Sequence, residues 1–148
     1  MDIDAMLQAY ARHISAVMGK STTTSTDELL QYGRRAFNAE NFLGVFPADV
    51  TPPRTPHRCF YVQNTDASDQ PGTHWVGIAR EPGQTDVVFD SFARRPSPTF
   101  LPHLQHMVRT EDDVDQARTG PGSTMCGQLC MAFGTIFLHH GRNAALKC

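Results

Sequence analysis

The chain has 148 residues, which suits one domain with a buried core. Its formal charge of −2 and pI near 6.4 give no general electrostatic attraction for nucleic acid, so a nucleic-acid partner is not expected. No window approaches the roughly 18 uninterrupted apolar residues of a membrane span. The acidic, amphipathic start is also unlike a signal peptide, so no membrane partner is expected.

Apolar residues recur at helical spacing over residues 3–18, which predicts an amphipathic helix. We treat residues 1–20 as an N-terminal helix ahead of a single domain at 21–148. The helix either packs on its own domain, which is the simpler expectation, or serves a partner. The polar stretch that follows is expected to be a linker, with Thr26 or Asp27 capping a second helix over "DELLQYGRRAF".

Residues 46–57 are too rich in proline for regular structure and predict a loop. Three short runs of aromatic and β-branched residues follow, separated by turn signals, and they predict an antiparallel meander. These runs are "CFYVQN" (59–64), "THWVGIA" (73–79) and "TDVVFDSF" (85–92). The next segment is polar and mixed, with a short helix expected around "FLPHLQHMV".

The last predicted element starts at Cys126 and reads "CGQLCMAFGTIFLHH". It has almost no polar face, which is typical of a helix buried on all sides. The small residues "TGPGST" before it are expected to let the backbone approach closely and to cap the helix start.

The four cysteines are too few and too unevenly spread for a disulfide-stapled protein, so we expect free thiols in a reducing, intracellular location. Cys148 ends the sequence and is expected to be exposed, with an open role. Cys126 and Cys130 could in principle bind a metal with His139 and His140. The histidines lie roughly 20 Å along the same helix from Cys126, so no metal site is expected.

Cys126 has a setting that suits catalysis. At a helix N-terminus, the helix dipole and unpaired backbone N–H groups favour a thiolate, which is nucleophilic. The same N–H groups can stabilise an oxyanion. Because cysteine is also a common buried residue, this setting does not by itself distinguish a nucleophile from a packing residue.

His74 and Asp90 supply the partners that a nucleophilic cysteine needs. If the last two strands form a hairpin that turns at Pro82 and Gly83, the numbers of paired residues sum to about 164. His74 and Asp90 would then lie opposite each other, within hydrogen-bonding reach. An aspartate that orients a histidine beside a cysteine is the arrangement for base-activated nucleophilic attack.

Four segments in order, "FLGVFPADV", "THWVGIA", "VFDSF" and "GPGSTMCGQLCMAF", resemble the adenain family of adenovirus-type processing proteases. They resemble more distantly the ubiquitin-like-protein proteases of the same clan. The resemblance implies an α+β, papain-like cysteine protease fold of the adenain type, in which a central buried helix carries the nucleophile and packs on a small antiparallel or mixed sheet. It makes Cys126 the nucleophile, His74 the general base and Asp90 the orienting acid, with Trp75 beside the histidine in a substrate groove.

The oxyanion position departs from the family pattern. The family has a glutamine just before its Gly-Pro-x-Ser segment, where this chain has Thr119. The nearest upstream glutamine is Gln116, which is our candidate oxyanion donor. Backbone N–H groups together with Thr119 are the alternative.

We therefore expect a cysteine endopeptidase that processes viral or virus-like precursor proteins next to small residues, often glycine. Removal of ubiquitin or a ubiquitin-like modifier is the main alternative. A catalytically weak substrate-binding relative and an acyltransferase of the same clan also remain open. The chemistry requires no cofactor. The resemblance adds an activating peptide or DNA, although the charge does not favour DNA, and a location in the host nucleus or the virion.

Overall fold

The structure, a computed structural model, describes residues 2–65, 74–91, 101–111 and 125–148. The described residues form a mixed α+β fold with four α-helices and a five-stranded sheet. The helices are α1 (Ile3–Met18), α2 (Thr26–Ala36), α3 (Cys126–His140) and α4 (Arg142–Leu146). The strands are β1 (Phe42–Phe46), β2 (Cys59–Asn64), β3 (Trp75–Arg80), β4 (Val87–Phe89) and β5 (Val108–Arg109), and a 3₁₀ turn, η1 (Pro102–Leu104), precedes β5.

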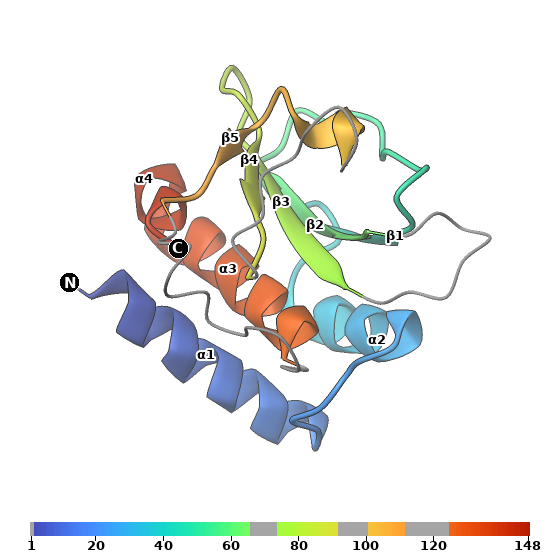
Figure 1. The fold of residues 1–148 in the computed structure, drawn as a ribbon, viewed down its shortest axis with the longest axis vertical. Helices are drawn as coiled ribbons and strands as arrows, with labels where there is room; N and C mark the ends of the chain where they lie inside the picture. Colours follow the sequence, from blue (N-terminus) through green and yellow to red (C-terminus); the bar gives the residue numbers. More distant parts are fainter. Residues whose placement is uncertain (1, 66–73, 92–100, 112–124) are drawn as a thin grey trace.

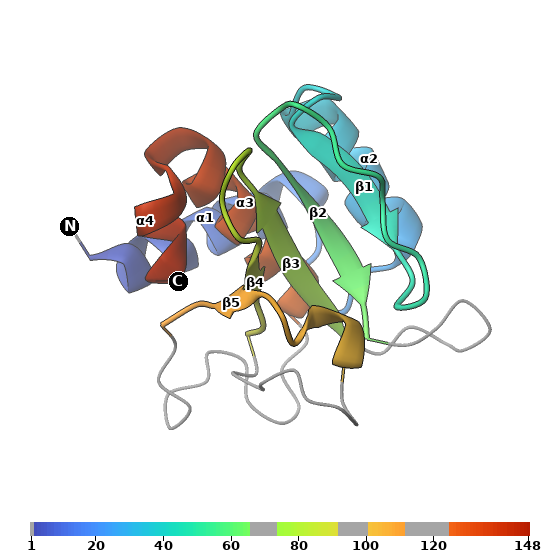
Figure 2. The same ribbon diagram turned by 90° about the horizontal axis from the view of Figure 1, so that it is seen from above.

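The sheet has the strand order β1-β2-β3-β4-β5. Its three central strands pair antiparallel, which confirms the predicted meander, and the outer strands β1 and β5 each pair in parallel with their neighbour. Figure 1 shows the sheet, α3 and α1 as successive layers, with α2 beside β1. In Figure 2 the helices α1 and α3 lie on the same side of the sheet. The opposite face packs against Leu101 and Leu104, around η1.

Strand β1 was not predicted. Its five residues, "FLGVF", contain Gly44 at a φ of 130°, and the pairing with β2 shifts register between Phe42 and Val45. A bulge of this kind interrupts the alternation of inward and outward side chains on which recognition of a strand depends. The short helix expected around "FLPHLQHMV" is present, within the described residues, as the single 3₁₀ turn η1.

Helix α1 packs on its own domain, which was the simpler of the two expectations for it. Asp2 caps its N-terminus by accepting a hydrogen bond from the N–H of Ala5, and Gly19 ends it in the left-handed conformation. Its buried stripe faces α3 and belongs to the main hydrophobic core. The stripe consists of Ile3, Leu7, Ala11 and Ile14, and Ser15 is buried beside it.

Helix α2 begins with a capping box whose N-cap is Ser25, not Thr26 or Asp27 as predicted. The Ser25 hydroxyl accepts a hydrogen bond from the N–H of Glu28, and the Glu28 carboxylate accepts one from the N–H of Ser25. This reciprocal pair explains the one-residue correction, because only Ser25 has a glutamate three residues later.

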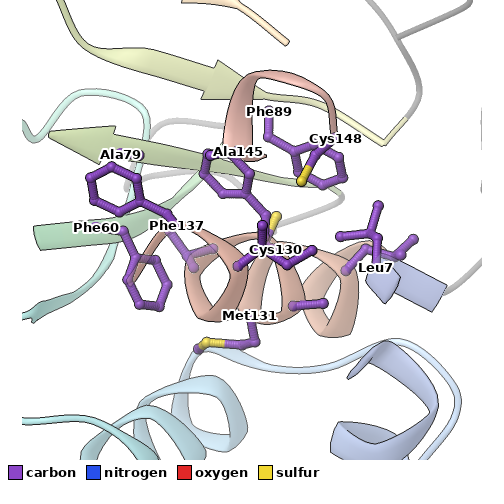
Figure 3. Close-up of a cluster of buried hydrophobic side chains, with 14 of the residues drawn as sticks. Leu7, Phe60, Ala79, Phe89, Cys130, Met131, Phe137, Ala145 and Cys148 are labelled. Carbon is purple, nitrogen blue, oxygen red and sulfur yellow. The ribbon is translucent and has the colours of Figure 1, made fainter. Parts of the chain in front are cut away.

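Helix α3 is buried on nearly all sides, as predicted, and forms the centre of the core. Figure 3 shows its side chains meeting Phe60 and Phe89 from the sheet and Leu7 from α1. Phe133 stacks on Phe89 with ring centroids 5.1 Å apart. Gly134 faces the ring of Phe60 so closely that a Cβ there would overlap it, so this glycine allows the helix to approach the sheet.

The four cysteines are free and buried, and the expectation that Cys148 is exposed was wrong. Helix α4 turns the chain back onto α3, which brings Ala145 and Cys148 into the main core beside Cys130 (Figure 3). These two residues lie three positions apart and therefore share one face of the terminal turn. No helix of the described ranges is both long and apolar enough to span a membrane.

The docking of α1 can be tested with Leu7→Ala. Leu7 is fully buried against α3, so truncation removes its transfer free energy and leaves a cavity. We expect the free energy of unfolding to fall by about 2–5 kcal/mol in chemical denaturation. Val17→Ala on the same helix is the matched control, because Val17 is 60% exposed and its truncation should change stability by no more than about 0.5 kcal/mol. Equal effects of the two substitutions would contradict the docked position of α1.

Candidate active site

His74 and Asp90 lie at the ends of neighbouring strands, His74 just before β3 and Asp90 just after β4. The His74 Nε2 and the Asp90 Oδ1 are 2.6 Å apart, and each residue is only 3% exposed. A buried contact this short is a strong, charge-assisted hydrogen bond when the imidazole is protonated. The structure therefore brings together the histidine and the aspartate that the sequence singled out.

The strand register behind this contact differs from the predicted one. Ile78 pairs with Val88, so His74 and Asp90 are displaced by two residues along the ladder and meet diagonally instead of directly opposite each other. A displacement of two keeps both side chains on the faces that were expected, whereas a displacement of one would have separated them.

The loop between the strands accounts for this difference. The buried Asp86 accepts hydrogen bonds from the buried Arg80 at 3.3 Å and from the exposed Arg54 at 3.0 Å, and these ion pairs close the hairpin before β4 begins. The turn is therefore longer on its β4 side than a turn centred on Pro82 and Gly83 would be.

Cys126 is the first residue of α3 and is 6% exposed. The N-cap residue Met125 has no side-chain oxygen and makes no side-chain cap, unlike the N-cap residues of α1 and α2. The thiol thus lies at the positive end of the most buried helix of the structure. Backbone N–H groups of this first turn have no partner within the helix.

The electrostatics couple Cys126 to His74. Burial is the largest single influence on the pKa of His74 and lowers it, because it disfavours the imidazolium. The hydrogen bond with Asp90 and the electrostatic interactions with Asp90 and Cys126 act in the opposite direction and together outweigh burial. The pKa of His74 is therefore raised above its ordinary value. Since Asp90 contacts Nε2, the ring nitrogen left for Cys126 is Nδ1.

Cys130 lies one turn further along α3 and differs sharply from Cys126. It is completely buried, and burial is the main reason that the pKa of its thiol is raised well above the usual value. The negative charges of Cys126 and Asp90 raise it further. Cys130 is therefore held as a neutral thiol, which is neither a nucleophile nor a metal ligand at neutral pH.

Trp75, predicted to line a substrate groove, is 5% exposed and belongs to the main core. Its indole N–H donates a 3.2 Å hydrogen bond to the backbone carbonyl of Thr24. The contacts described here are thus internal to the protein, and the groove role stays a prediction. Gln116, Thr119 and the small residues before α3 lie outside the described residues, so the predicted oxyanion donor and helix cap also stay predictions.

Sequence reasoning missed Gln128, which is 0% exposed in the second position after Cys126. Its Nε2 donates hydrogen bonds to the backbone carbonyls of Lys20 and Thr22, at 3.1 and 3.0 Å. The signal available in the sequence was a lone amide side chain near the start of the most apolar helix, where a polar group must find buried partners.

Within the described parts of the chain, no group of three or more histidine, cysteine or acidic residues is placed to hold a metal ion. Comparison of the chain with models of known protein families and with curated proteins finds no match in either set. The function is therefore inferred from the geometry of His74, Asp90 and Cys126.

The contribution of Asp90 to the pKa of His74 can be tested with Asp90→Asn. The substitution removes the carboxylate charge that favours the imidazolium, so the pKa of His74 should fall. An NMR titration of the His74 ring protons in the two proteins measures the change. Cys126→Ala should also lower this pKa, because it removes the second group that favours the imidazolium.

The same shift makes stability depend on pH. A raised pKa of His74 contributes stability in full below the unfolded value of about 6.5, and this contribution is lost as the pH rises through the folded value. The advantage of the wild type over Asp90→Asn in free energy of unfolding should therefore be larger at about pH 5.5 than at about pH 9. An advantage that grows with pH would show that His74 is held neutral in the folded protein.

Proposed function

We propose that this protein is a cysteine endopeptidase in which Cys126 is the nucleophile, His74 the general base and acid, and Asp90 the residue that orients His74. The observation that supports this most directly is the buried 2.6 Å contact between Asp90 and His74, whose other ring nitrogen is left for a cysteine at a helix N-terminus. A nucleophile, a base and a group that orients the base are the three parts that this chemistry needs.

In the proposed reaction, the sulfur of Cys126 forms a bond to the scissile carbonyl carbon, and the carbonyl π electrons move onto its oxygen. Backbone N–H groups at the start of α3 are suited to stabilise that oxyanion. His74 takes the proton of the Cys126 thiol, and the resulting imidazolium gives it to the leaving amine as the oxyanion collapses and the C–N bond breaks. Water then loses a proton to His74 and bonds to the thioester carbonyl carbon. As the C–S bond breaks, the acid product leaves and the sulfur of Cys126 recovers the proton from His74. The raised pKa of His74 suits the proton-donating step near neutral pH.

The substrate class rests on the resemblance of the ordered motifs. We propose that the fold is of the adenain type and that the substrates are viral or virus-like precursor proteins cut beside glycine or another small residue. Stimulation by a peptide or by DNA, and action in the host nucleus or the virion, also belong to this proposal through the resemblance alone.

The decisive test is reaction of the protein with peptide electrophiles that carry a C-terminal glycine. We expect a covalent adduct on Cys126, detected by mass spectrometry, and cleavage of matching Gly-containing peptides. His74→Ala should slow both by about 10²–10⁴-fold, because it removes the proton carrier. A ubiquitin-derived electrophile, run in parallel, distinguishes precursor processing from removal of a ubiquitin-like modifier.

Two cysteine substitutions on the same helix provide the controls. Cys126→Ala should abolish both adduct and cleavage, whereas Cys130→Ala should retain them, because the Cys130 thiol is buried and held neutral. If no electrophile or peptide gives a reaction that depends on Cys126, the protein is not a cysteine protease.

A further inference from the structure

The linker between α1 and α2, residues 19–25, passes directly over the first turn of α3. Gln128 holds it there through the two hydrogen bonds from its amide nitrogen to the carbonyls of Lys20 and Thr22. Gly127 lies so close to the Thr24 hydroxyl that a Cβ at this position would overlap it. The linker is thus packed and hydrogen-bonded against the two residues that follow Cys126.

The same linker is also tied to the strand that carries the histidine. The indole N–H of Trp75 donates to the carbonyl of Thr24, and Trp75 directly follows His74 in the chain. One short segment therefore contacts the residue after His74 and the residues after Cys126.

The linker between α1 and α2 is anchored at both ends. Gly19 closes the end of α1, and the Ser25 capping box opens α2 immediately after the linker. Lys20 and Glu28 form an ion pair with a 2.9 Å N–O distance that spans it. Each end of the linker is thus anchored in a helix whose own terminus is satisfied.

A brace at this point would act on both groups, because Cys126 and His74 both lie at the ends of their elements. The close approach of α3 to β3 occurs further along, where Gly77 meets Phe133 and the backbone of Cys130. That contact lies one to two turns beyond Cys126. Element ends are held by fewer backbone hydrogen bonds than element centres, so they are free to move unless something else holds them.

The free-energy cost of burying the Gln128 amide oxygen indicates that this side chain has a specific role in holding the linker. Its Oε1 makes no hydrogen bond within the described residues, although the side chain is fully buried. A polar atom buried without a partner lowers stability, and an apolar side chain of the same length would avoid this cost. Packing alone therefore does not account for a glutamine at this position.

We propose that the linker at residues 19–25 is a brace that fixes the separation of Cys126 and His74, with Gln128 and Trp75 as the positioning residues that attach it to α3 and to β3. The inference rests on the proposed function. It extends that function to two residues that act through the nucleophile and the base. A displacement of about 1 Å between reacting groups can cost about 10²-fold in rate, so loss of the brace should slow the reaction of Cys126.

The test measures the rate at which iodoacetamide alkylates Cys126, as a function of pH, with the site of modification identified by mass spectrometry. Gln128→Met keeps the length of the side chain and removes both donors, and Trp75→Phe keeps an aromatic ring and removes the N–H. We expect each variant to react about 10–100-fold more slowly than the wild type at neutral pH. We also expect its pH profile to move toward that of His74→Ala, which a purely structural role would not produce.

Gln63→Met is the matched control. Gln63 is also a fully buried glutamine whose Nε2 holds a loop by two backbone carbonyls, those of Pro47 and Val50. It is paired with Val76, whose side chain packs on the sheet face opposite α3. Its loss should lower the melting temperature about as much as the loss of Gln128 and leave the alkylation of Cys126 unchanged.

The outcomes separate the brace from the proposed function. If wild-type Cys126 reacts no faster than Cys126 in His74→Ala, the catalytic pair does not exist and both proposals fail. If the wild-type rate depends on His74 but Gln128→Met and Trp75→Phe keep the wild-type profile, the brace is wrong and the protease proposal stands. Should Gln128→Met fail to fold, Trp75→Phe decides the matter alone.

Discussion

The burial of α3 is the constraint on which the rest of the structure depends. Because this helix has no polar face, it is stable only when it is enclosed, and the sheet covers one side of it while α1 covers another. Gly77 and Gly134 allow the sheet and α3 to approach closely, because a Cβ at either position would overlap a phenylalanine ring. Enclosure fixes the direction of the helix and so carries its first residue, Cys126, to the place where the strands β3 and β4 present His74 and Asp90.

Burial also decides how the polar groups of the site are arranged. A carboxylate and an imidazole that are almost fully removed from water cost free energy unless each finds a partner. Asp90 and His74 are each other's partners at 2.6 Å, and the carboxylate acts together with Cys126 to outweigh the effect of burial on the pKa of the ring. The polar site is therefore compatible with the apolar core that surrounds it, and Cys130, which has no such partner among the described residues, is held as a neutral thiol.

The sequence predicted the parts of this arrangement that follow from strong periodicity. The limits of β2 and the first residue of α3 agree with the structure, because a run of aromatic and β-branched residues and an apolar helix preceded by small residues are clear local signals. Long-range contacts were less accessible. The bulge at Gly44 concealed β1, the ion pairs of Asp86 shifted the hairpin register, and the folding of α4 onto the core buried Cys148. Each of these depends on specific tertiary partners, such as Arg54 for Asp86, which periodicity does not encode.

The start of α3 contrasts with the starts of the other two long helices. Asp2 and Ser25 each give a side-chain oxygen to the first turn of their helix, an interaction typically worth about 1 kcal/mol. The N-cap of α3 is Met125, which has no such oxygen to offer. A helix packed on all sides is stabilised by its core contacts and does not require a cap. Omitting the cap leaves the first-turn N–H groups next to Cys126 without a side-chain oxygen from the N-cap residue, and in the proposed reaction this is where the oxyanion forms. The core contacts of α3 thus stabilise a helix whose N-cap residue gives no side-chain oxygen to the first turn, at the position where the proposed chemistry would use the backbone N–H groups.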